Sequence, residues 1–129
     1  MIEEAIYSLV TKNRTITTLI GQRFYPNVIP QTADLPAVAY QVISAGRNYH
    51  HGGQSSLVTP VIGFTIDARN YSEAKAVAAA MRLALSGYQG YVDSVKIESI
   101  FLQNEFEGYN PASEIHLVRQ DYQITWKEV

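Results

Sequence analysis

Apolar residues recur with a helical period in three parts of the chain. Near the N-terminus they fall at i, i+3, i+4, i+7 and i+8, which places on one helix face Ile2, Ala5, Ile6, Leu9 and Val10. A shorter stripe at residues 16–20 is followed by Gly21, a plausible helix stop. The longest pattern covers residues 70–87, where Asn70 and Glu73 have capping-box spacing and Gly87 ends the run. We therefore predict an N-terminal helix, a short second helix and one long central helix.

Four other segments alternate apolar and polar residues, as strands do: residues 37–45, 57–69, 95–106 and 114–127. Residues 23–36 hold three prolines, which favours an extended surface segment. Pro60 cannot donate a ladder hydrogen bond, so it should lie at a strand start or on an edge. The first two strands should form a long hairpin.

The order of these elements is helix, short helix, two strands, helix, two strands. Helices that interleave with hairpins predict an α+β fold with a mainly antiparallel four- to five-stranded sheet, with the N-terminal helix and the long central helix packed on one face. We expect ten side chains to be largely core: Leu35, Val38, Tyr40, Phe64, Ile66, Val77, Met81, Ile97, Phe101 and Trp126.

The composition narrows the class of protein. The chain has 129 residues, 47% of them hydrophobic, which suits one domain spanning residues 1–129. Charged residues are 17%, below the roughly 25% typical of soluble domains, so neighbouring subunits should cover part of the surface. A net charge of -2 gives no footprint of a general nucleic-acid binder. The absence of cysteine excludes disulfides and thiolate metal sites, and no apolar run reaches the roughly 18 residues of a membrane helix.

The segment GRNYHHGGQSS, residues 46–56, is the most conspicuous candidate site, since it holds two of the three histidines. Adjacent residues of an extended chain point to opposite sides, so His50 and His51 are badly placed to share one metal ion. Arg47, Tyr49, His50 and His51 mix basic and aromatic groups, as single-strand nucleic-acid binders do, but they are too few to hold a nucleic-acid backbone. The better interpretation is a hairpin tip that contacts a partner, through the side chains of Arg47, Asn48, Tyr49, His50, His51 and Gln54.

Catalysis has one candidate pair. Asp67 and Asp121 lie in predicted strands, where they could pair with Arg69, with Arg119 or with each other as general acid and base. The competing interpretation is a set of strand salt bridges or subunit contacts. The alternative function that this pair leaves open is a small-molecule-binding or enzymatic α+β domain.

Four stretches, taken in order, resemble the small tail completion proteins of long-tailed bacteriophages, also called tail terminator or head-to-tail joining proteins. They are GQRFYP at residues 21–26, LPAVAYQ at 35–41, DARNYSEA at 67–74 and DYQITWKE at 121–128. The resemblance spans nearly the whole chain, and YHHGG is not part of it.

The resemblance implies a structural virion protein with no catalysis and no cofactor. Its expected state is a homo-oligomeric ring, a hexamer, that caps the tail tube and joins it to the head connector or stopper protein. DNA would pass through the ring without sequence recognition, and no membrane would be involved. Assembly would take place in the bacterial host cytoplasm. The nine tyrosines suit a protein that touches other proteins, because tyrosine is enriched at interfaces.

Overall fold

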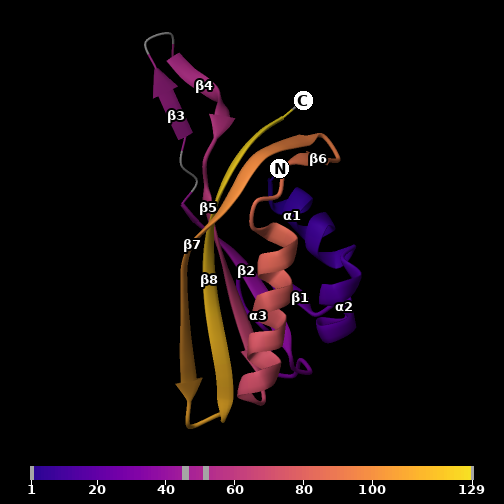
Figure 1. The fold of residues 1–129 in the computed structure, drawn as a ribbon. Coiled ribbons are helices and arrows are strands. Elements are labelled where there is room, and N and C mark those ends of the chain that lie inside the picture. The colour runs from indigo at the N-terminus through magenta and orange to yellow at the C-terminus, as the bar shows by residue number, and fades with distance from the viewer. Residues whose placement is uncertain (1, 45–46, 51–52, 129) are drawn as a thin grey trace.

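The computed structural model describes residues 2–44, 47–50 and 53–128, with residues 47–50 and 53–58 described by their backbone (Figure 1). The elements follow one another in the order α1 (Ile2–Thr11), α2 (Arg14–Ile20), β1 (Phe24–Pro26), β2 (Ala37–Ser44), β3 (Arg47–His50), β4 (Gly53–Val58), β5 (Val61–Ala68), α3 (Tyr71–Leu85), β6 (Gly90–Val92), β7 (Val95–Asn110) and β8 (Ile115–Glu128).

The strands join in one sheet whose main path is β1-β2-β5-β8-β4-β3. β7 pairs with the other edge of β8 along its whole length, and β6 pairs with the start of β7. Every pairing is antiparallel except that of β1 with β2. The expected α+β class and antiparallel character are confirmed, but four to five strands was too low. β1, β3 and β6 have three or four residues each, too few for a period of two to show in the sequence.

All three helices lie on one face of the sheet, as expected (Figure 1). The local signals of α3 act as predicted, because the Asn70 side chain accepts a hydrogen bond of 2.8 Å from the Glu73 N–H. Between helices and sheet lies a core that includes six of the predicted residues: Val38, Phe64, Ile66, Val77, Met81 and Ile97. Leu35, Tyr40 and Trp126 are half-buried.

Phe101 contradicts the predicted core, since 60% of its surface is exposed. The register of β7 against β8 shifts between Ile97 and Ser99, and this bulge inserts one residue into the alternation. Ile97 and Ile100 therefore share the buried face, while Phe101 turns to the face that no helix covers. A one-residue slip reverses every side chain after it, and the sequence does not show where the slip falls.

Pro60 separates β4 from β5, as its missing donor requires. Its carbonyl still accepts a hydrogen bond of 3.0 Å from Ile124 N, so β4 and β5 follow one another along the same edge of β8. The long hairpin of β2 and β5 is confirmed, but it continues into a second hairpin, β3–β4, which projects beyond the body of the sheet (Figure 1). We call β3–β4 the arm.

Candidate functional site

The arm carries the residues predicted to contact a partner. Residues 47–50 form β3, and Gln54 lies in β4, where its backbone pairs with Tyr49. His51 lies outside the described residues. Among the residues that the structure describes, one register pair joins the arm to β8, namely Val58 with Trp126, at the C-terminal end of β8. The structure thus shows a paired hairpin at this place, and its contact with a partner stays a prediction.

The two candidate acids do not come together. Asp121 is paired across the sheet with Gly63, and Asp67 with Leu117, so both side chains lie on the open face but four residues apart along β5. At about 3.3 Å per residue, this separation is about 13 Å. Asp67 borders a shallow cavity of about 590 Å³ that Arg69 and Ser113 also line. Burial raises the pKa of Asp67, but no second carboxylate lines that cavity.

Asp121 has a structural partner instead. Arg119 Nε donates a hydrogen bond of 2.9 Å to Asp121 Oδ1, and Arg119 Nη1 lies 3.4 Å from Thr65 Oγ1. The guanidinium lies over Gly63, where an added Cβ would overlap both Arg119 and Asp121. The strand salt bridge is therefore the confirmed interpretation of Asp121.

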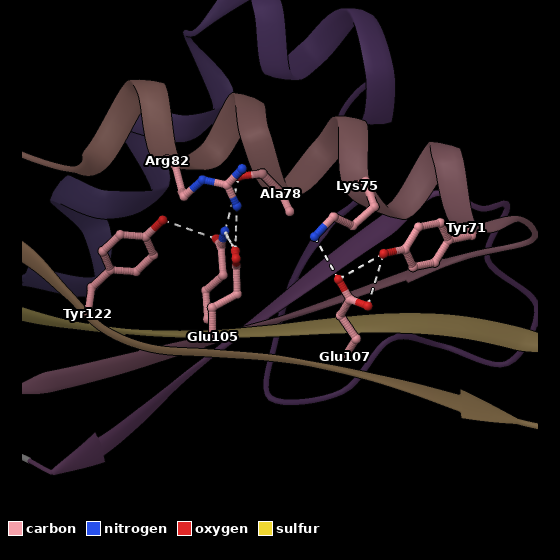
Figure 2. A network of polar contacts seen from close by, with 8 residues as sticks. Tyr71, Lys75, Ala78, Arg82, Glu105, Glu107 and Tyr122 are labelled. Atoms are coloured by element: carbon pink, nitrogen blue, oxygen red, sulfur yellow. Dashed lines mark hydrogen bonds and ion pairs between the residues drawn. The ribbon is translucent and has the colours of Figure 1, made fainter.

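A polar seam joins α3 to the β7–β8 hairpin, and Figure 2 labels seven of its members: Tyr71, Lys75, Ala78, Arg82, Glu105, Glu107 and Tyr122. Gln120 is the eighth member, and we call the set the α3–β7 seam. At its buried centre, Gln120 Nε2 donates to Ala78 O at 3.0 Å and to Glu105 Oε1 at 2.6 Å. Gln120 Oε1 accepts from Tyr122 Oη at 3.1 Å. Gln120 and Tyr122 are fully buried, and all the hydrogen-bonding groups of the amide have partners.

Two of the three glutamates of β7, Glu105 and Glu107, are neutralised by cations of α3. Arg82 Nη1 lies 2.6 Å from Glu105 Oε1, and Lys75 Nζ lies 2.6 Å from Glu107 Oε2 (Figure 2). Tyr71 Oη also donates to Glu107, at 3.0 Å. The hydrogen bond from Lys75 lowers the pKa of Glu107, and the same bond raises the pKa of Lys75. The seam thus holds the outer half of β7 against the helix.

The other edge of β7 is open beyond its start. β6 covers residues 95–97, and the Gly87 N–H donates to Ile100 O at 2.9 Å. Among the described residues, no strand pairs with the outer edge of residues 104–110. We call residues 104–110 the open run of β7. Phe106 and Tyr109, both about half exposed, lie on it.

Neither the seam nor the open run is directly visible in the sequence. The available signal was the spacing of the charges. Lys75 and Arg82 are seven residues apart, on one helix face. Glu105 and Glu107 are two residues apart, on one strand face. Matching the two pairs required the position of α3 across β7, which no local pattern specifies.

Two further properties bear on function. Within the part of the chain that the structure describes, no three His, Asp or Glu side chains are grouped so as to hold a metal ion. No helix there is both long and apolar enough to cross a membrane.

Comparison with known proteins first defines the fold. The structure is similar to a chain from a solved structure described as "Virion of native gene transfer agent (GTA) particle", with a TM-score of 0.78. The similarity covers 98% of this chain and 94% of that chain at 17% sequence identity, so it shows a shared fold. No curated protein sequence matches this chain.

The family follows from the sequence. A family model described as "Tail completion protein gp17" matches residues 4–127, nearly the whole chain. The protein belongs to this family, as the order of its motifs predicted. It is a structural tail protein of the phage type.

Proposed function

We propose that this chain is the subunit of a homo-oligomeric ring, six copies round, that caps a phage-type tail tube and joins it to the head connector or stopper protein without catalysis. The observation that carries the proposal is the family match over residues 4–127. On this proposal residues 1–129 act as one domain, located in the virion and assembled in the bacterial host cytoplasm. DNA passes through the ring without sequence recognition, in keeping with the net charge of -2.

The surface of the subunit supports a role in assembly. A closed ring with head-to-tail contacts needs two different patches on each subunit. The arm and the open run of β7 lie at opposite ends of the molecule (Figure 1). They differ in structure, since the arm is a two-stranded hairpin and the open run is a sheet edge. Exposed aromatic residues also gather on the β6–β7 ribbon: Tyr91, Phe101, Phe106 and Tyr109. A subunit with neighbours on several sides would bury such groups.

Within this proposal the arm contacts the tail tube protein or the head connector. The side chains assigned to this contact are those of Arg47, Asn48, Tyr49, His50, His51 and Gln54. The support is the position of β3–β4 beyond the sheet body, where neither sheet nor helix covers it (Figure 1).

The first test is the shape of the assembled protein. Light scattering and negative-stain microscopy should find rings of about six subunits, alone or on purified tail tubes. A protein that stays monomeric at every concentration and forms no ring on added tail tubes would contradict the proposal.

The second test separates ring formation from joining. A variant with Tyr49, His50 and Gln54 changed to alanine keeps the backbone of the arm, so rings should form while head–tail joining in vitro fails. A matched control changes three exposed residues of the β1–β2 connection to alanine, namely Val28, Gln31 and Thr32. Normal joining by the first variant would remove the arm from the contact.

A further inference from the structure

The two ends of this sheet differ in how their edges are protected. β1 is an edge of three residues that ends in Pro26, and both features discourage the addition of a further strand. The open run of β7 has seven residues and contains neither proline nor lysine. Its two charges, Glu105 and Glu107, are neutralised by Arg82 and Lys75, so they do not guard the edge. β1 thus carries two features that discourage strand addition, and the open run of β7 carries neither.

The direction of the backbone N–H and C=O groups on the open run follows from the hydrogen bonds between β8 and β5. Ile124 N donates to Pro60 O, so the backbone of Ile124 points toward β5 and away from β7. The register of β5 against β8 is unbroken over Val61–Ala68, so alternation gives Gln120, Val118 and His116 the same direction. Their partners across β7 are Glu105, Glu107 and Tyr109. These three residues therefore direct their N–H and C=O groups outward, to the open edge.

The arm, in turn, lacks a third strand. A two-stranded ribbon is marginally stable in water by itself, and a third strand or a packed face is needed. In the described part of the chain, β3 pairs only with β4, and β4 meets the body at the single pair Val58–Trp126. The outer edge of β3 is therefore available for a third strand.

One chain cannot satisfy both needs internally. The arm joins β8 at Trp126, near its C-terminal end, whereas the open run pairs with residues 115–121 at the other end. Figure 1 shows the arm and the β7–β8 turn at opposite extremes of the molecule. Only a second copy can bring β3 to an open run. β3 contains Arg47 and no acid, so its addition brings no negative charge to Glu105 and Glu107.

We propose that β3 of one copy adds as a strand to the open run of β7 in the next copy. The sheets of successive subunits then join end to end, and the hydrogen bonds of the added strand set their order around an assembly. This inference rests on the proposed ring and specifies the contact that closes it. The backbone of β3 is engaged by the next copy, which leaves its side chains and the turn for the tail tube or connector.

The test is disulfide cross-linking, for which the absence of native cysteine makes the chain suitable. One subunit carries Tyr109→Cys, and a second carries cysteine at one of the four positions of β3 in turn. The matched control replaces Tyr109→Cys with Phe101→Cys, on the same strand and similarly exposed, 60% against 52%, but outside the open run. A disulfide needs Cα atoms within about 7 Å, so the reaction reports contact between particular strands.

At least one β3 position should cross-link to the Tyr109→Cys subunit at least tenfold more than to the Phe101→Cys subunit. Equal yields with both would indicate random collision and overturn the strand pairing. Rings by microscopy with no β3 cross-link to Tyr109→Cys would also overturn it, while leaving the proposed function intact. No rings and no cross-links for any pair, even on tail tubes, would overturn both proposals.

Discussion

The buried amide of Gln120 offers the sharpest test of the α3–β7 seam. Gln120→Leu keeps the approximate volume but removes an acceptor and two donors. Ala78 O keeps its helical partner and Glu105 keeps Arg82, whereas the hydroxyl of Tyr122 is left buried without a partner. A buried unsatisfied polar group costs about 1–3 kcal/mol, and each lost hydrogen bond about 1 kcal/mol net. Burial of leucine offsets part of this, so we expect a loss of roughly 2–3 kcal/mol.

A double-mutant cycle separates the seam from general packing. Tyr122→Phe alone should cost about 1–2 kcal/mol, because it leaves Gln120 Oε1 without its donor. Removing both partners leaves no orphaned hydroxyl, so the double variant should be more stable than the sum predicts by about 1–2 kcal/mol. Urea unfolding at one fixed subunit concentration measures all four proteins, since association would otherwise shift the midpoints. Additivity within about 0.5 kcal/mol would refute the network.

Three other outcomes follow from burial and titration. Ile100→Ala should destabilise by about 2–5 kcal/mol and Phe101→Ala by far less, because only Ile100 is buried; similar losses in urea unfolding would contradict the bulge. Burial raises the pKa of Asp67, so the protonated carboxyl contributes its full share of folding stability below about pH 4, and this share is lost as the pH rises. Asp67→Asn, which stays neutral, should therefore raise the Tm at pH 7 but not at pH 3. Burial also raises the pKa of Tyr122, so stability should fall above about pH 10, and Tyr122→Phe should flatten that alkaline loss in a pH series of unfolding midpoints.

The local pattern determined the parts of the fold that local physics controls. The helices at residues 2–11 and 71–85 and the break at Pro60 follow from apolar period, capping and a missing N–H. The order of these elements was enough to predict an antiparallel sheet with helices on one face. The motifs distributed along the chain also indicated the tail completion family, which the match over residues 4–127 confirms.

Tertiary structure decided what depends on register and on contacts between distant segments. The bulge after Ile97 turned Phe101 out of the core, although its alternation favoured burial. Strand register separated Asp67 from Asp121, and the position of α3 brought Lys75 to Glu107 and Arg82 to Glu105. The open edge of residues 104–110 is likewise a property of the sheet, because a strand has a free edge only when the place of every other strand is fixed.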